Sequence, residues 1–195
     1  MSQQIETHPF PAILPPHATV MMMGSFPPKE EKRCMAFHYP NFQNDMWRVY
    51  GAVFFGRADY FQVPNEKRFD AERIKQFLWV RGVALCPTVR KAIRLQDNAS
   101  DKFLKVVETV NLSEVLPQVP HCRWIFTTGG KATTILLSLL PEKVKEPKTN
   151  SFIPYPYPNF DLNLYRLPST SRAYPLAFDK KVAAYRAFFA MVGLI

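Results

Sequence analysis

Four short apolar runs along the chain each stop at a glycine or a proline. They span residues 18–23, 83–86, 123–128 and 162–167, and they are followed by Gly24, Pro87, Gly129 and Pro168. A short apolar run bounded by such residues is typical of a buried β-strand, because glycine and proline end regular structure. The pattern therefore predicts four strands, each of which delivers the backbone into a turn.

Between these runs, apolar residues recur at helical spacing. Helices are predicted from Asn44 or Asp45 to about Phe55, from Asp70 to Gly82, over part of 101–117, over 131–140 and over about 178–192. Asparagine and aspartate favour helix starts because their side chains accept backbone N–H groups there. Gly82 favours a helix end, since glycine adopts the left-handed backbone without strain. Strands that alternate with helices imply a layered α/β domain with a mainly parallel sheet.

Two further segments are rich in proline and show no helical or strand-like spacing of apolar residues. Residues 1–17 are rich in proline and are expected to form an arm packed across the surface of one domain, residues 18–195. Residues 141–160 are expected to be loop-rich, because they also hold several prolines. A chain of 195 residues that is 47% hydrophobic can bury a substantial core as one domain.

The charge balance is strongly basic. There are 25 lysines and arginines against 16 aspartates and glutamates, which gives a formal net charge of +9 at pH 7. An excess of this size favours a polyanionic partner, with nucleic acid ahead of an acidic membrane surface. A basic but inert surface is the alternative interpretation, because the charges are spread along the chain in modest clusters.

Cysteines and histidines offer no pattern for a metal or a redox cofactor. Cys34, Cys86 and Cys122 lie far apart without CxxC spacing, which argues against a disulfide framework, a zinc ribbon or an iron–sulfur cluster. The four histidines form no ligand pair such as HxxxH. No signal-like N-terminus occurs, and no apolar run approaches the ~20 residues of a membrane span. We expect a cytoplasmic monomer that uses no metal and no cofactor.

The candidate chemistry lies where strands end. The first strand runs into residues 24–28, GSFPP, and the last runs into residues 167–175, LPSTSRAYP. In open parallel sheets, ligands bind beyond the carboxyl ends of the strands. GSFPP could be an ordinary turn, and the hydroxyl residues of LPSTSRAYP could be helix caps. Hydroxyls and backbone amides at a helix start also suit an anion such as phosphate.

A third segment, residues 37–47, reads FHYPNFQNDMW and places aromatic residues before Asn44. An exposed glycine turn, an aromatic ring and one amide together suit a planar heterocycle, because stacking a base on an aromatic face contributes roughly 1–3 kcal/mol. Each residue has a structural alternative as well. Asn44 could be a helix N-cap, and Tyr39 could be a core or rim aromatic.

Together these three segments resemble the motifs of the uracil-DNA glycosylase superfamily. They are closest to its mismatch-specific uracil and deoxyinosine (hypoxanthine) glycosylase branch, and the likeness runs from about Val20 to the final helix. The resemblance implies a three-layer α/β/α domain with a short, mainly parallel central sheet. Departures occur at Phe26, at Asn41-Phe42 and at Arg172, where the family carries an acidic or amide residue, a His-Pro pair and a proline. The first departure makes a strong uracil enzyme less expected.

The resemblance also assigns roles residue by residue. It implies that Asn44 is catalytic and orients a water beneath the sugar C1′, with the adjacent Asp45 second in rank. The residues expected to bind the base are Gly24, Ser25, Phe26, Pro27 and Tyr39, of which Tyr39 is the stacking platform and Phe37 and His38 are weaker candidates. Those expected to grip DNA phosphates are Ser169, Thr170, Ser171 and Arg172.

The implied activity is that of a monofunctional DNA glycosylase in base excision repair. Such an enzyme rotates a deaminated base of the uracil or hypoxanthine type out of DNA and hydrolyses its N-glycosidic bond without a cofactor. The resemblance places no lysine as a Schiff-base nucleophile, so strand cleavage is not expected. Two alternatives remain open: a superfamily member that binds DNA or a modified base without turnover, and a nucleoside hydrolase, which the +9 charge favours less.

Overall fold

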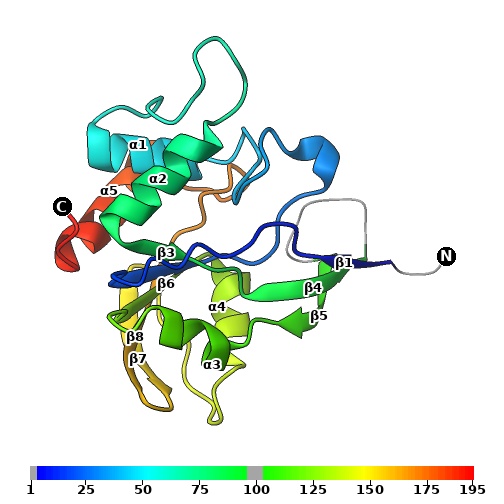
Figure 1. Cartoon of the computed structure of the whole chain (residues 1–195), viewed down its shortest axis with the longest axis vertical. Coiled ribbons are helices and arrows are strands. Elements are labelled where there is room, and N and C mark those ends of the chain that lie inside the picture. Colours follow the sequence, from blue (N-terminus) through cyan, green and yellow to red (C-terminus); the bar gives the residue numbers. More distant parts are fainter. Residues whose placement is uncertain (1–3, 96–102) are drawn as a thin grey trace.

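The structure is a computed structural model, and it describes residues 4–95 and 103–195. Within them, the larger sheet has the strand order β3-β2-β6-β8-β7 (Figure 1). Its strands are β2 (Val20–Met23), β3 (Val83–Leu85), β6 (Trp124–Thr128), β7 (Ser151–Tyr157) and β8 (Phe160–Leu167). Neighbouring strands are parallel from β3 to β8, and only the edge strand β7 is antiparallel to its neighbour. The prediction of a mainly parallel sheet is confirmed.

Helices cover both faces of this sheet (Figure 1). On one face lie α1 (Met46–Phe55), α2 (Ala71–Arg81) and α5 (Phe178–Met191), and on the other lie α3 (Leu112–Val115) and α4 (Gly130–Leu137). β2 shows why the sheet is covered twice: Val20 and Met22 pack into the first layer's core, whereas Met21 and Met23 pack into the second. A strand buried on both faces reads as a continuous apolar run. The three-layer α/β/α class is confirmed.

The helix ends follow the expected chemistry. The Asp70 side chain accepts the N–H of Arg73 at 3.0 Å, and Gly82 ends α2 with φ +66°. At α1, Asp45 occupies the cap position, but its side chain makes no capping bond. The Asn44 side chain instead accepts the N–H of Met46 at 2.9 Å. Within the described residues, no helix is long and apolar enough to cross a membrane.

A second sheet was not predicted. β4 (Val89–Arg94) pairs antiparallel with β1 (Ile5–Thr7) and with β5 (Leu104–Thr109). The helix predicted over part of 101–117 is found at α3, which continues into the short η3 (Leu116–Gln118), whereas residues 104–109 form the unpredicted strand β5. Residues 101–102 lie outside the described residues. The β-branched pair Val106-Val107 and long-range pairing with β4 favour a strand.

The loop-rich expectation for 141–160 is wrong for 151–157, which form β7. Pro154 and Pro156 occupy alternate positions of this strand, and β7 lies at the edge of its sheet. An edge strand tolerates proline because a missing N–H on its outer side costs no ladder hydrogen bond. A short helical turn, η1, spans Glu30–Lys32. The N-terminal segment pairs through β1 and through a bridge between Ile13 and Leu85.

Candidate active site

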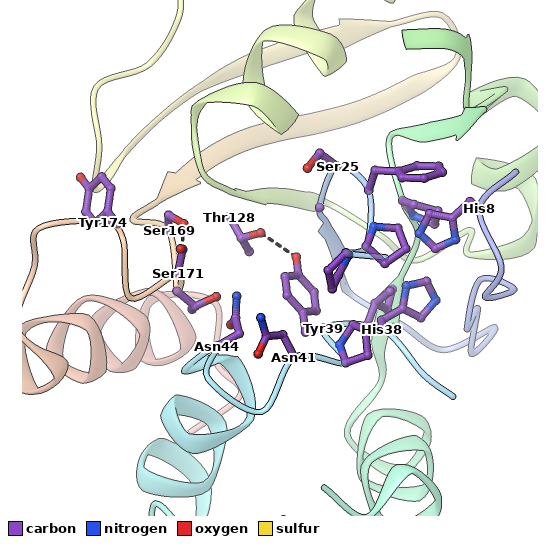
Figure 2. A pocket seen from close by; sticks show the side chains of 18 of the residues that line it. His8, Ser25, His38, Tyr39, Asn41, Asn44, Thr128, Ser169, Ser171 and Tyr174 are labelled. Atoms are coloured by element: carbon purple, nitrogen blue, oxygen red, sulfur yellow. Dashed lines mark hydrogen bonds between the residues drawn. The ribbon is translucent and has the colours of Figure 1, made fainter. Parts of the chain in front are cut away.

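A cavity of about 530 Å³ opens beyond the carboxyl ends of the parallel strands (Figure 2). It is the place where open parallel sheets collect ligands. Segments far apart in the sequence line it: the turn after β2, the end of β6, the loop after β8 and the residues that lead into α1. The predicted site residues that line it are Gly24, Ser25, Phe26, Pro27, Tyr39, Asn44, Ser169, Thr170 and Ser171. Arg172 is not among the lining residues.

Tyr39 is fixed in the cavity wall by its backbone and by its hydroxyl. Its φ of +51° lies in the left-handed region, which costs a residue other than glycine about 1–2 kcal/mol. Its hydroxyl hydrogen-bonds the Thr128 hydroxyl at 2.6 Å, and its ring meets the edge of Trp47. A Cβ at position 24 would overlap the Tyr39 hydroxyl. Gly24 is therefore required by the approach of this ring.

The turn that follows Gly24 is held from both sides. The backbone N–H and the hydroxyl of Thr88 both donate to the Gly24 carbonyl, at 2.8 and 3.0 Å. The Arg94 guanidinium donates to the Pro27 carbonyl at 2.6 Å and lies over the Phe26 ring, 5.5 Å from its centroid. The turn is therefore a rigid wall, which suits recognition of a rigid ligand.

Asn44 lines the cavity beside Asn41, between Tyr39 and Ser171 (Figure 2). Its backbone N–H donates to the Asn41 carbonyl at 2.9 Å, and Arg48 donates to its carbonyl at 3.2 Å. One lone pair of its side-chain oxygen accepts the Met46 N–H. An amide oxygen has two lone pairs, so the side chain retains an acceptor site as well as its NH2 group. The capping role and a role toward a ligand are compatible.

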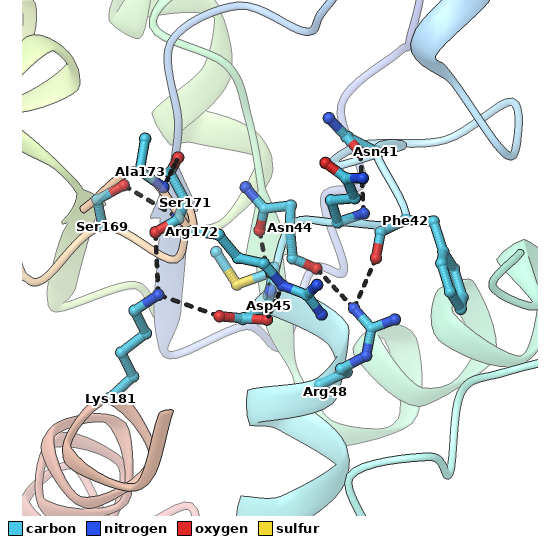
Figure 3. A network of polar contacts seen from close by, with 12 residues as sticks. Asn41, Phe42, Asn44, Asp45, Arg48, Ser169, Ser171, Arg172, Ala173 and Lys181 are labelled. Atoms are coloured by element: carbon cyan, nitrogen blue, oxygen red, sulfur yellow. Dashed lines mark hydrogen bonds and ion pairs between the residues drawn. The ribbon is translucent and has the colours of Figure 1, made fainter. Parts of the chain in front are cut away.

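A buried ion pair between Lys181 and Asp45 joins α5 to the start of α1, and both residues also hydrogen-bond the loop after β8 (Figure 3). The Lys181 ammonium donates to the Asp45 carboxylate at 3.0 Å and to the Ser171 carbonyl at 2.9 Å. The Asp45 N–H donates to the Thr170 carbonyl at 3.0 Å. Both Thr170 and Lys181 are buried. This network fixes the loop relative to Asn44.

Sequence reasoning missed Lys181. It lies four residues before Tyr185 and seven before Phe188, and all three are buried along one side of α5. A lysine on the apolar face of an amphipathic helix indicates a buried partner of opposite charge, because burying an unpaired ammonium group has a large free-energy cost. That signal was present in the sequence, but the partner, Asp45, is far away along the chain.

Arg172 and Asp45 lie beside the cavity. The Arg172 guanidinium donates to the other oxygen of the Asp45 carboxylate at 3.1 Å, and 56% of its side chain is exposed. With Arg48 and Lys181 they line a neighbouring cavity of about 370 Å³. Asp45 is therefore bound by two cations, whereas Asn44 lines the larger cavity.

Two histidines line the larger cavity opposite Asn44 (Figure 2). His8 follows β1 and was not predicted to be near a site, because only the pairing of β1 with β4 brings it there. Its ring lies 5.2 Å from the ring of His38 and 5.4 Å from that of Phe26. Burial lowers the pKa of His8 to about 4 and that of His38 to about 3, so both imidazoles are neutral near pH 7.

The cysteines take no part in this site. Cys86 and Cys122 are buried in the core, and burial raises the pKa of each thiol to about 12. Across residues 4–95 and 103–195, no group of three or more histidine, cysteine, aspartate and glutamate side chains is placed to hold a metal ion. The polar and aromatic side chains that line the cavity offer amide, hydroxyl, imidazole, phenol and phenyl groups.

Comparison with known proteins found no matching family model and no matching curated relative. Among solved structures, the fold is similar to that of a solution NMR structure from Methanosarcina acetivorans described as a "putative Uracil DNA glycosylase". The TM-score is 0.66 at 20% sequence identity, and the match covers 97% of this chain and 99% of that chain. At this identity the likeness establishes a shared fold over the full length of both chains.

Proposed function

We propose that this protein is a monofunctional DNA glycosylase of the uracil-DNA glycosylase superfamily. It binds DNA, rotates a deaminated base of the uracil or hypoxanthine type into the 530 Å³ cavity and hydrolyses the N-glycosidic bond. The observation that carries the proposal is the convergence of GSFPP, Tyr39, Asn44 and the hydroxyl loop on one cavity. The name of the structural neighbour supports the same activity.

Base binding rests on the rigid aromatic wall. The Tyr39 ring, held by Thr128, offers a face on which a planar base stacks, and such a contact contributes roughly 1–3 kcal/mol per base. Phe26 meets the edge of His8 and closes another side of the cavity. A base enclosed in this way is separated from bulk water, which strengthens each polar contact to it.

Bond cleavage is assigned to a water that Asn44 orients. A neutral amide is too weak a base to take a proton near pH 7, so Asn44 acts by holding the water beneath C1′. The water oxygen forms a bond to C1′ as the C1′–N bond breaks, and the proton that the water then loses passes to the departing base anion. The electron pair of that bond leaves with the base, and backbone N–H groups near Ser25 and Phe26 stabilise its negative charge.

Hydrolysis without strand cleavage fits the position of Lys181. A Schiff-base mechanism needs a neutral amine that reaches C1′. The Lys181 ammonium is bound to the Asp45 carboxylate and the Ser171 carbonyl, and it lines the smaller cavity. It is therefore assigned to holding the loop, and the product is an abasic site in an intact strand.

DNA contact is assigned to the loop of Ser169, Thr170, Ser171 and Arg172. Arg172 is the most exposed of the four, and its guanidinium has N–H groups beyond the one that binds Asp45. Thr170 is buried, so it acts by shaping the loop, whereas Arg172 and the half-buried Ser171 face the phosphates. Such contacts position the protein without selecting a base.

One observation favours a second candidate, a superfamily member that binds DNA without turnover. The Asn44 oxygen accepts the Met46 N–H, which is the bond of a helix cap. One experiment distinguishes the two candidate functions. Oligonucleotides with uracil, hypoxanthine or xanthine, in single and double strands, are incubated with the protein, and alkali then cleaves any abasic site.

We expect base release by the wild type and a loss of roughly 10²-fold or more in the single-turnover rate for Asn44→Ala, the scale expected when a group that positions the attacking water is lost. Asn44→Asp keeps the cap, since aspartate caps as well as asparagine. The melting temperature of each variant is the control. A stability loss with an unchanged rate per folded molecule makes Asn44 a cap only, and an inactive wild type that still binds lesion DNA establishes the second candidate.

A further inference from the structure

His38 is anchored through one ring nitrogen only. Its Nε2 lies 2.8 Å from the carbonyl oxygen of Pro11. A carbonyl can only accept a hydrogen bond, so Nε2 carries the proton. The ring is neutral near pH 7, because burial holds its pKa far below that range. A neutral imidazole protonated at Nε2 has a bare lone pair at Nδ1, which can only accept a hydrogen bond.

The Nδ1 atom faces the larger cavity. It has no hydrogen-bond partner within residues 4–95 and 103–195, yet those residues contain no buried side-chain nitrogen or oxygen without a partner. Solvent therefore reaches Nδ1, although only 4% of His38 is exposed. Because His38 lines the 530 Å³ cavity, the cavity is the source of that exposure. An acceptor nine-tenths buried and open to a cavity is suited to reading a ligand.

We propose that His38 Nδ1 is the specificity-determining acceptor of the cavity and reads the ring N–H of a lactam base, an inference that rests on the proposed glycosylase function. Hypoxanthine carries this N–H at N1 and uracil carries it at N3. Adenine and cytosine carry a bare nitrogen at the same ring positions, and its lone pair repels that of Nδ1. The selection therefore favours uracil over cytosine and hypoxanthine over adenine, by reading the Watson–Crick edge.

The neighbours of His38 keep this acceptor in place. Three aromatic rings pack around its imidazole. The ring centroids of Phe37, His8 and Phe10 lie 5.1, 5.2 and 5.6 Å from that of His38. The indole N–H of Trp47 donates to its backbone carbonyl at 3.0 Å. Its backbone and its ring are thus both fixed, so Nδ1 cannot turn away from a base that presents a lone pair. A rigid acceptor discriminates, whereas a mobile one adapts.

Two substitutions of His38 separate the proposed role of Nδ1 toward the base from the anchoring of Nε2 to Pro11. His38→Gln keeps a donor at the position of Nε2, toward Pro11, and removes the acceptor at Nδ1. His38→Asn places an amide oxygen where Nδ1 lies and gives up the bond to Pro11. A matched control is His17→Gln, because His17 also lies within 2.9 Å of a backbone carbonyl, that of Trp79, but does not line the cavity.

The substrates are duplexes with hypoxanthine or N1-methylhypoxanthine, and with uracil or N3-methyluracil, in which a methyl group replaces the ring N–H. Single-turnover release and binding by fluorescence anisotropy are both measured. We expect the wild type to prefer each lactam by on the order of 10-fold or more, as for a buried donor that finds its acceptor. His38→Gln should lose most of that preference, whereas His38→Asn and His17→Gln should retain it. Melting temperatures identify a variant that misfolds.

The outcomes distinguish the two proposals. If the wild type acts on or binds the lactams and His38→Gln keeps the full preference, the reading role is wrong and the glycosylase proposal stands. The reading role is equally wrong if His38→Asn folds but loses the preference. If the wild type neither releases nor distinguishes any of these bases, the proposed function fails and the reading role fails with it.

Discussion

Gly24 illustrates how a single residue acts through an absent side chain. GSFPP suggested a glycine needed for a turn, but Gly24 does not have a positive φ. What excludes a side chain is the hydroxyl of Tyr39, which occupies the place of a Cβ at position 24. The same hydroxyl binds Thr128, so its position is fixed at both sides. The glycine and the aromatic ring are therefore one unit of the cavity wall.

This arrangement predicts the effect of Gly24→Ala. The added methyl group pushes the Tyr39 hydroxyl off Thr128 and tilts the ring, and overpacking of this kind costs typically 1–3 kcal/mol. We expect base release to fall by on the order of 10-fold, because a displaced platform misaligns the base. Adding Tyr39→Phe removes the hydroxyl and should restore part of the rate. Equal rates for Gly24→Ala and the wild type would show that the ring position is not limiting.

Some residues of the cavity could be predicted from the sequence and others could not. Tyr39 and Asn44 belong to a local motif between a predicted strand and a predicted helix, so residues adjacent in the sequence are enough to place them near the site. His8 reaches the cavity only because Ile5–Thr7 pairs with Val89–Arg94, a contact between distant segments that no local pattern reports. His38 was ranked below Tyr39 as an aromatic, and its tautomer depends on the carbonyl of Pro11.

Among elements, the strands of the central sheet were the most predictable, because burial on both faces leaves an uninterrupted apolar run. β4 and β5 were harder, since their exposed positions carry charges such as Lys91 and Glu108, which form an ion pair across the strands. β7 was hidden by its prolines, which are permitted only because it is an edge strand. These three segments form strands because of the neighbours they pair with in the sheets, and that pairing is a property of the whole fold.

The junction of α1, α5 and the 168–172 loop predicts a strong coupling. Lys181→Met removes the partner of a buried carboxylate, for which the penalty is about 3–5 kcal/mol, and Arg172 offsets part of it. Lys181→Met with Asp45→Asn leaves no unpaired buried charge, since Arg172 is exposed to water, and should recover much of the loss. Urea denaturation of both single variants and the double variant measures the coupling energy. Additive free-energy changes would mean that the pair contributes nothing as a pair.

The same junction links stability to function. Lys181 holds the Ser171 carbonyl, and Asp45 holds the Thr170 carbonyl through its backbone N–H. In Lys181→Met the loop is therefore expected to bind DNA less tightly, while the base preference stays unchanged, since preference is assigned to the opposite wall of the cavity. A changed preference would place the loop in base selection.

For the molecule as a whole, the net charge of +9 predicts how affinity responds to salt. Each neutralised phosphate releases condensed counterions, so log K falls with log salt with a slope of about −0.9 per phosphate. We expect a slope of roughly −3 to −5 between about 50 and 200 mM salt, for four to five phosphate contacts. Fluorescence anisotropy with a labelled duplex measures it.

Two arginine variants test whether the salt dependence arises from contacts of the loop beside the cavity. Arg172 and Arg57 are both exposed and both paired with an aspartate, but only Arg172 lies in the loop beside the cavity. Arg172→Ala should make the slope less steep by about one and weaken binding to lesion and normal duplexes alike, because a phosphate contact carries no base information. Arg57→Ala should leave the slope unchanged. Equal effects of the two variants would reduce the role of Arg172 to general charge, and a wild-type affinity independent of salt would remove DNA as the main ligand.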